Sequence, residues 1–286
     1  MSELSQRVVV VTGGSAGIGR ATVERLVSDG ARVVTCARDG DRLADAVGAL
    51  RGVTCVTADM VDAADRARLL EGTLTEHGRL DGVVLNAGLG WAGLVEDMPA
   101  DAVAGIVALN LTGAIELTRL ALPHLLAAAR ERGRGDVVAV SSVAAWAQVP
   151  PLTVYSATKA GLAGFVKGLR REVTARGVRV HTVNPFFVET EWLARGHGHA
   201  PTSDADAEGR LSRGIAPERV ADRIAGCLRS PWSRTVSVPR WAGAARLGEV
   251  TPVNRLLDLA FSPQADRIRA AARRAVAARI GDRTVA

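Results

Sequence analysis

The chain has 286 residues, 48% of them hydrophobic, which is enough for one large domain or two small ones with a substantial core. Its formal net charge of +6 could suit a nucleic acid, but the arginines are spread along the chain and aromatic residues make up only 3% of it, so we expect no nucleic-acid partner. No uninterrupted apolar run approaches the length of a membrane span, and the opening MSELSQR lacks the apolar segment of a secretory signal, which predicts a soluble, cytoplasmic protein.

The residues that could bind a metal are few and scattered. Cys36, Cys55 and Cys227 are far apart and form no CxxC pair, which favours buried thiols over a disulfide framework or a zinc site. His197 and His199 have no carboxylate or cysteine partner at ligand spacing, so an exposed loop explains them better than a metal. We predict no metal site.

The chain up to about residue 185 alternates short β-branched runs with longer helical patterns. The runs that predict strands are residues 7–13, 31–37, 52–58, 80–88, 135–142 and 178–185, and residues 235–241 can add a seventh. Helical stretches of about 12 to 20 residues separate them, as parallel strands require. The pattern predicts an α/β fold, a Rossmann-type doubly wound parallel sheet of about seven strands with helices on both faces.

The stretch TGGSAGIG, residues 12–19, follows the first predicted strand and opens a helix. Glycine there lets the backbone turn sharply and approach a phosphate, while the N-terminus of the helix presents N–H groups to it. A glycine-rich loop without a ligand is the alternative, but the strand, turn and helix context favours a dinucleotide-binding loop.

The stretch VYSATKAG, residues 154–161, holds the only tyrosine of the chain, Tyr155, and one of its two lysines, Lys159. A phenol has a pKa near 10, and a nearby ammonium lowers it by stabilising the phenolate. Positions i and i+4 share one face of a helix, so the two side chains can lie together. Arginine would be a poor substitute, because its broad fork is harder to place beside a phenol. The spacing predicts a catalytic pair.

Taken together, the spacing Gly13-x-x-x-Gly17-x-Gly19, the NAG at residues 86–88 and a serine thirteen residues before Tyr155 resemble the short-chain dehydrogenase/reductase family over about residues 7–190. The resemblance implies a catalytic set of Asn110, Ser142, Tyr155 and Lys159. In it, the serine hydrogen-bonds the substrate oxygen, the tyrosine gives or takes its proton, the lysine lowers the tyrosine pKa and holds the ribose, and the asparagine helps to hold the lysine through water. The nicotinamide carries the hydride.

The resemblance also implies cofactor contacts at the ends of strands and the beginnings of helices. They are Gly13, Ser15, Gly17, Ile18, Gly19, Arg38, Asp59, Met60, Asn86, Ala87, Gly88, Tyr155, Lys159, Pro185, Val188 and Thr190. Asp59 would contact the adenine ring; a solvated strand end explains it equally well.

The end of the second predicted strand bears on which cofactor binds. NAD-specific members of the family place an acid there, whereas this chain has Ala37 followed by Arg38, whose guanidinium suits a 2′-phosphate. Asp39 is better explained as the cap of the next helix. We expect NADP(H) over NAD(H), although residues 15 and 16 lack the second basic residue seen in many NADP-preferring relatives.

The chain departs from the family in two places. Phe186 stands where the family usually has glycine, either as a bulky group near the nicotinamide or as packing under a lid, and the usual ending with a final strand and DGG is missing. We predict one catalytic domain over residues 1–250, with a lid over about 189–214, and a helical arginine-rich extension over 251–286. The apolar face of this extension is mostly alanine, which favours solvated or packed surface over membrane contact, with partner contact as a third interpretation.

These features predict an NADP(H)-dependent oxidoreductase that interconverts a ketone and a secondary alcohol. A bulky apolar substrate is expected, because apolar side chains flank the predicted site: Phe186, Phe187, Trp192, Leu193, Trp91 and Leu94. Two alternatives are a catalytically idle nucleotide-binding regulatory or scaffold protein and a sugar-nucleotide epimerase or dehydratase, whose relatives space the fingerprint as TGxxGxxG. The small residues Ala157, Gly161, Gly164 and Gly168 lie at helical spacing, and the family resemblance then implies a homodimer or homotetramer.

Overall fold

The computed structural model describes residues 3–148, 150–189, 214–249 and 256. In this part of the chain, one parallel sheet holds seven strands in the order β3-β2-β1-β4-β5-β6-β7. The strands are β1 (Val8–Thr12), β2 (Arg32–Ala37), β3 (Val53–Thr57), β4 (Gly82–Leu85), β5 (Gly135–Val140), β6 (Val178–Pro185) and β7 (Thr235–Val238). The predicted doubly wound fold is confirmed, and the chain order reverses between β1 and β4, where such sheets bind ligands.

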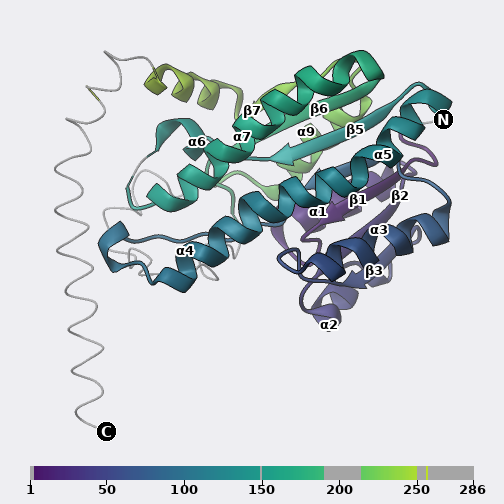
Figure 1. Cartoon of the computed structure of the whole chain (residues 1–286), viewed down its shortest axis with the longest axis horizontal. Coiled ribbons are helices and arrows are strands. Elements are labelled where there is room, and N and C mark those ends of the chain that lie inside the picture. The colour runs from purple at the N-terminus through teal and green to yellow at the C-terminus, as the bar shows by residue number, and fades with distance from the viewer. Residues whose placement is uncertain (1–2, 149, 190–213, 250–255, 257–286) are drawn as a thin grey trace, which may run out of the picture.

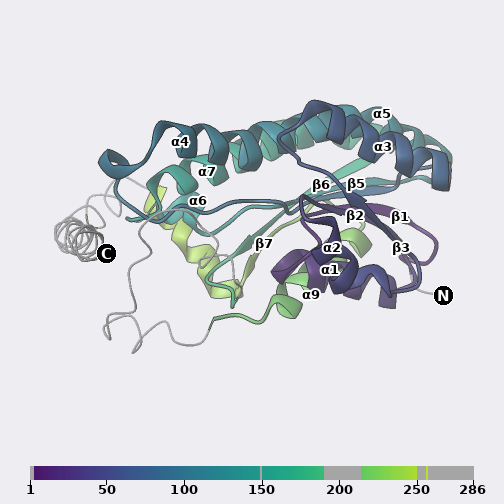
Figure 2. The ribbon, with the colours of Figure 1, turned by 90° about the horizontal axis from the view of Figure 1, so that it is seen from below.

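Helices cover both faces of the sheet (Figures 1 and 2). One layer contains α3 (Ala63–His77), α4 (Ala100–Val107), α5 (Ala114–Arg132) and α7 (Thr153–Val173), and the other contains α1 (Gly17–Ser28), α2 (Gly40–Leu43) and α9 (Pro217–Arg229). Shorter elements are α6 (Ala144–Ala147), η1 (Ala44–Gly48), η2 (Val95–Asp97), η3 (Ala108–Gly113), η4 (Thr174–Arg176) and η5 (Arg240–Glu249). Strands covered on both faces can be apolar throughout, which is why β1 reads VVVVT and is buried along its length.

The predicted strands are correct in number, and most are longer in the prediction than in the structure. The fourth, predicted over residues 80–88, pairs only over Gly82–Leu85, and the seventh ends at Val238 instead of residue 241. The chain leaves the sheet early at these ends because the next residues form the loops of the candidate site. Residues 190–213, which hold most of the expected lid, and all of the expected extension except Leu256 lie outside the described residues.

The helical stretch Ala100–Arg132, made of α4, η3 and α5, is long and apolar enough to cross a membrane by length and composition alone. Core helices of soluble proteins meet the same criterion, and this stretch packs along the sheet as part of a helical layer (Figure 2).

A cluster of charged side chains lies at the amino edge of the sheet, away from the loops of the candidate site. Asp136, at the start of β5, is fully buried and accepts from Arg7 Nη2 at 2.6 Å, from Arg134 Nε at 2.7 Å and from His181 Nε2 at 3.0 Å. The other ring nitrogen of His181 accepts from the backbone N–H of Arg234 at 3.2 Å. Burial alone would raise the pKa of Asp136, but the hydrogen bonds from His181 and Arg134 and the charge of Arg7 lower it to about 2.

Candidate active site

The glycine-rich loop between β1 and α1 is held against the end of β2. The N–H groups of Gly13 and Gly14 donate to the Cys36 carbonyl at 2.9 and 3.1 Å, and Gly13 has a φ of 76°, which favours glycine. A Cβ on Gly19 would lie 1.9 Å from the Gly13 oxygen, so no side chain fits there. The N-cap of α1, Ala16, makes no side-chain cap, and the first turn carries no acid. Its N–H groups are therefore available to an anion, and the loop fits the pyrophosphate of a dinucleotide.

The NAG turn after β4 is tied to this loop through Asn86. Its side-chain amide donates to the carbonyls of Thr12 at 2.9 Å and Gly13 at 3.3 Å, while the N–H groups of Asn86 and Ala87 both donate to the Thr12 hydroxyl at 3.0 Å. Thr12 was not among the predicted site residues, although it opens the TGGSAGIG stretch. It joins the two loops on either side of the point where the strand order reverses.

The ends of β2 and β3 carry the residues expected at the adenosine end. Asp39 caps α2 by accepting from the Arg42 N–H at 3.0 Å, which confirms its predicted role, and Arg38 is exposed. Asp59 accepts from the Val61 N–H at 2.9 Å, so part of its carboxylate stabilises its own turn.

Met60 is buried next to Asp59, and its carbonyl accepts from the buried Arg66 side chain at 2.7 Å. The turn that carries Asp59 and Met60 is therefore held in place by Arg66, which lies near the start of α3.

The two residues of the tyrosine and lysine motif lie on one face of α7, as their spacing predicts. The side chains of Tyr155 and Ser142 are hydrogen-bonded. Lys159 Nζ donates to the Val140 carbonyl at 2.9 Å and lies 5.8 Å from the centre of the tyrosine ring. All three side chains are at most 9% exposed. The end of β5 and the start of α7 thus bring a hydroxyl, a phenol and an amine together.

Burial shifts both titrating groups toward their neutral forms. It raises the pKa of Tyr155 to about 12, against the opposing effect of the hydrogen bond from Ser142, and it lowers the pKa of Lys159 to about 8. The Lys159 amine is directed to the Val140 carbonyl, and the expectation that its ammonium lowers the tyrosine pKa stays a prediction. Tyr155 is a neutral phenol at neutral pH, the form that can donate a proton.

Asn110 lies in η3, the π-helical turn between α4 and α5. Its amide oxygen accepts from the Leu89 N–H at 2.7 Å, and its amide nitrogen donates to the Leu89 carbonyl at 2.8 Å and to the Thr158 hydroxyl at 3.1 Å. A Cβ on Gly88 would lie 3.3 Å from the Asn110 oxygen and 3.4 Å from Lys159 Nζ. Asn110 thus holds the segment after NAG in place, and its amide oxygen and the lysine both lie close to Gly88.

The end of β6 places Pro185 beside the serine. The Pro185 carbonyl accepts at 3.0 Å from the N–H of Val143, the residue after Ser142. Val188 pairs with Ile215, and Thr190 lies outside the described residues. The structure thus gathers the described part of the predicted set at the carboxyl edge of the sheet.

The structure offers little to a metal ion in the part of the chain that it describes. No group of three or more His, Cys, Asp or Glu side chains in residues 3–148, 150–189 and 214–249 could hold a metal ion. Cys36 and Cys227 are buried as predicted, whereas Cys55 is only partly buried. His197 and His199 lie outside the described residues.

A model of the short chain dehydrogenase family matches residues 7–197, which hold this whole site. The chain belongs to that family. L-fucose dehydrogenase of Mus musculus is 38% identical over 223 residues, 74% of this chain and 77% of that protein. An uncharacterized oxidoreductase of Myxococcus xanthus is 33% identical over 269 residues, 91% of this chain and 98% of its own length.

The solved structures include a 3-ketoacyl-(acyl-carrier-protein) reductase from Brucella melitensis complexed with NADH. It has a TM-score of 0.75 and 26% identity, with 83% of this chain and 99% of that chain covered. This short-chain dehydrogenase/reductase is therefore an oxidoreductase that acts on a CH–OH or C=O group with a nicotinamide dinucleotide.

Proposed function

We propose that this short-chain dehydrogenase/reductase interconverts a ketone and a secondary alcohol with NADP(H), and that its substrate is bulky and apolar. The observation that carries the reaction is the buried cluster of Ser142, Tyr155 and Lys159 beside the dinucleotide-binding loop. A protein that only binds nucleotides has no need of this arrangement, which disfavours the idle scaffold.

In the reductive direction, the phenol of Tyr155 donates its proton to the carbonyl oxygen, which Ser142 also hydrogen-bonds. The ammonium of Lys159 stabilises the phenolate that remains, because opposite charges attract strongly in a desolvated interior. Asn110 supports this set from behind by fixing the segment after NAG. A bound nicotinamide supplies or accepts the hydride.

The preference for NADP(H) rests on the end of β2. Arg38 is exposed there, and the acid that directly follows it, Asp39, is engaged as the cap of α2. An exposed guanidinium at this position suits a 2′-phosphate better than a ribose hydroxyl.

A second candidate substrate class comes from the relative in Mus musculus, whose name gives L-fucose, a small polar sugar, as its substrate. We favour the apolar class because Phe186 is 40% exposed at the edge of the sheet that carries the site. A substrate that covers exposed aromatic surface gains about 25 cal/mol per Å² of apolar area removed from water.

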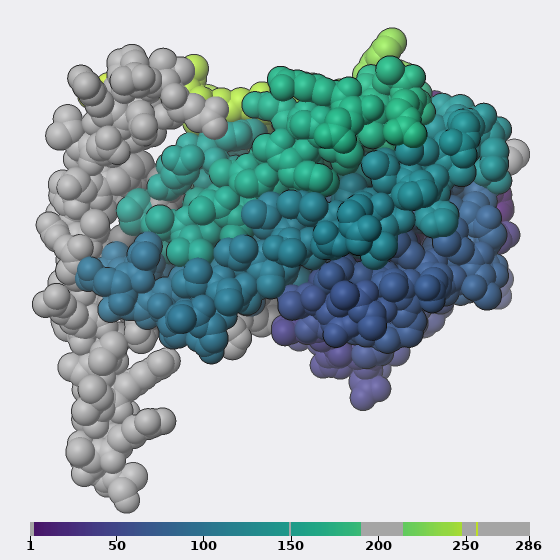
Figure 3. All heavy atoms as spheres, viewed as in Figure 1, coloured from purple at the N-terminus to yellow at the C-terminus, as the bar shows by residue number. Residues whose placement is uncertain are grey.

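We also propose that the enzyme forms at least a dimer through α5 and α7, which share one face of the molecule (Figure 3). Only 22% of the most apolar window of Ala100–Arg132 is buried within the chain. On α7, nothing lies within 4 Å of a Cβ added to Gly164 or Gly168, so another helix could approach closely there. Gly161 instead accommodates Leu111 of the same chain, whose side chain lies 3.1 Å from the added Cβ.

The test of the reaction is Tyr155→Phe, with a panel of apolar ketones and alcohols and L-fucose followed at the absorbance of the reduced cofactor. We expect the variant to lose activity and to keep its cofactor affinity, because the phenol performs chemistry and contributes little to binding. Turnover within about tenfold of the parent would refute the mechanism. Highest kcat/KM on L-fucose would refute the apolar substrate class.

A further inference from the structure

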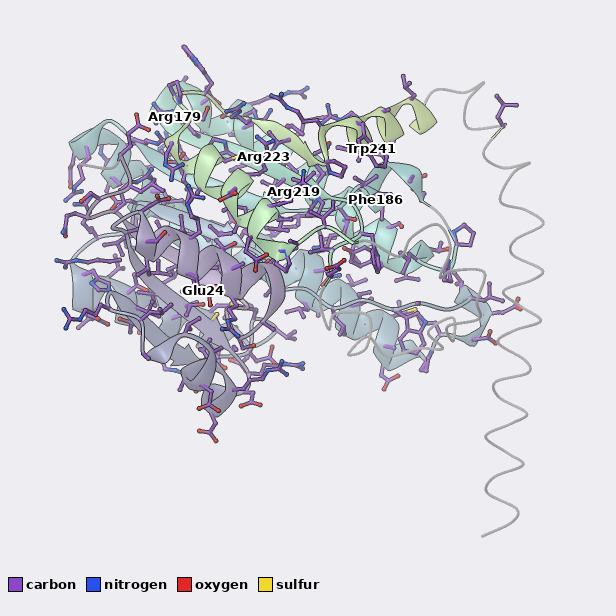
Figure 4. The ribbon with its side chains drawn as sticks, turned by 180° about the vertical axis from the view of Figure 1, so that it is seen from behind. Glu24, Arg179, Phe186, Arg219, Arg223 and Trp241 are labelled. Atoms are coloured by element: carbon purple, nitrogen blue, oxygen red, sulfur yellow. The ribbon has the colours of Figure 1, made fainter. Side chains whose placement is uncertain are left out.

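The segment after β7 brings a tryptophan to the edge of the sheet that carries the catalytic residues. Phe186 continues the ladder beyond β6 by donating its N–H to the Val238 carbonyl at 2.8 Å, and Trp241 follows three residues after Val238, in η5. The two ring centres lie 5.5 Å apart with an angle of 56° between the planes. Figure 4 shows both side chains close together, at the other end of the sheet from Arg179, the second residue of β6.

This pair is linked to the catalytic residues by a short path. Pro185, which precedes Phe186, is hydrogen-bonded to the residue after Ser142. The segment η5 also packs on α6, which begins two residues after Ser142, and the Arg246 guanidinium lies 4.4 Å from the centre of the Trp146 ring in α6. Phe186 therefore follows a residue that is bonded to the serine loop, and Trp241 belongs to η5, which packs on the helix after that loop.

The pair leaves much aromatic surface open. Trp241 is 67% exposed and Phe186 is 40% exposed, although each ring already contacts the other. Phe187 points to the other side of the chain, since its ring would lie 3.1 Å from a Cβ on Gly214. Only Phe186 of the two phenylalanines thus combines with Trp241 into one surface.

We infer that Phe186 and Trp241 determine substrate specificity by binding the apolar, preferably planar, part of the substrate remote from the reacting carbon. This inference rests on the proposed function and names the residues that would confer its preference. Tilted aromatic pairs accept a third ring readily, and such a contact raises affinity by about tenfold. The pair takes no part in proton or hydride transfer.

The chain offers a matched control in Trp232. It is 77% exposed and precedes β7, whereas Trp241 follows it, so the two tryptophans lie at opposite edges of a parallel sheet. Both indoles are mostly exposed, and thermal unfolding of both variants checks that they fold.

The experiment compares the parent with Trp241→Ala, Phe186→Ala and Trp232→Ala on 2-acetylnaphthalene and on 2-butanone. We expect Trp241→Ala and Phe186→Ala to lower kcat/KM for 2-acetylnaphthalene by about tenfold, mainly by raising KM. The same variants should change kcat/KM for 2-butanone by less than about twofold. Trp232→Ala should match the parent, and Trp241→Phe should restore most of the preference.

Equal losses on both ketones, the same loss in Trp232→Ala or weaker cofactor binding in Trp241→Ala would overturn the assignment. If the parent reduces neither ketone with either cofactor, the proposed function fails. Equilibrium dialysis of 2-acetylnaphthalene against the parent and Trp241→Ala then tests the pair separately, and equal binding rejects it.

Discussion

Asp136→Asn should destabilise the protein by about 3 kcal/mol without touching the active site. Asp136 is fully buried, and every group that faces it is a donor: Arg7, Arg134 and His181. An asparagine amide would turn an N–H₂ toward one of these donors and leave the arginine charges without a counter-ion. The histidine cannot compensate by changing its tautomer, because its other nitrogen accepts from Arg234.

The magnitude follows from the pKa of Asp136, which its hydrogen bonds and the nearby arginine charges lower to about 2. A shift of this size corresponds to about 2 kcal/mol of stability at neutral pH, and breaking a buried ion pair typically costs about 3–5 kcal/mol. Because the folded pKa is the lower one, this contribution is complete above the unfolded value and is lost as the pH falls toward 2.

Urea unfolding of parent and variant between pH 4 and 8 measures the effect. We expect a constant gap of about 3 kcal/mol above pH 5, a lower melting temperature by about 6–12 °C, and a gap that begins to close near pH 4. The control is Asp222→Asn, since Asp222 forms an exposed ion pair with Arg25 and should cost less than about 1 kcal/mol. A loss in Asp136→Asn no larger than in this control would refute the reasoning.

Three further outcomes are expected. Arg38→Ala should weaken NADPH binding by about tenfold, equal to about 1.4 kcal/mol, and leave NADH binding unchanged. Arg32→Ala, at the amino end of β2, should alter the binding of neither cofactor. Equal losses for both cofactors in Arg38→Ala would show that Arg38 does not contact the 2′-phosphate. His181→Gln should reduce the loss of stability between pH 7 and 5. Burial lowers the folded pKa of His181, so the stability that the neutral ring contributes is complete above the unfolded pKa of about 6.5 and is lost as the pH falls below that value. An unchanged dependence of stability on pH in the variant would contradict this. Light scattering at micromolar concentration should give at least a dimer, and introducing Arg at Gly164 should shift it toward monomer; a monomeric parent rejects the proposed contact between helices.

Local patterns in the sequence were sufficient for the strands, the tight glycine-rich loop and the placement of Tyr155 and Lys159 on one helix face. A run such as VVVVT can be stable only where both faces of a strand are covered, Gly19 is required by a contact six residues away, and Tyr155 and Lys159 share a helix face at i and i+4. In each case the physical constraint acts over a short stretch of chain, so it is visible in the order of the residues.

The tertiary structure decided what depends on partners far along the chain. The pKa of Tyr155 rises because burial by distant elements outweighs its hydrogen bond with Ser142, and Asn110 acquires its contacts from Leu89 and Thr158. Trp241 was not predicted near the site, because nothing in residues 235–241 shows that β7 ends early and turns back beside Phe186. Desolvation and long-range packing depend on the whole fold, and no local spacing encodes them.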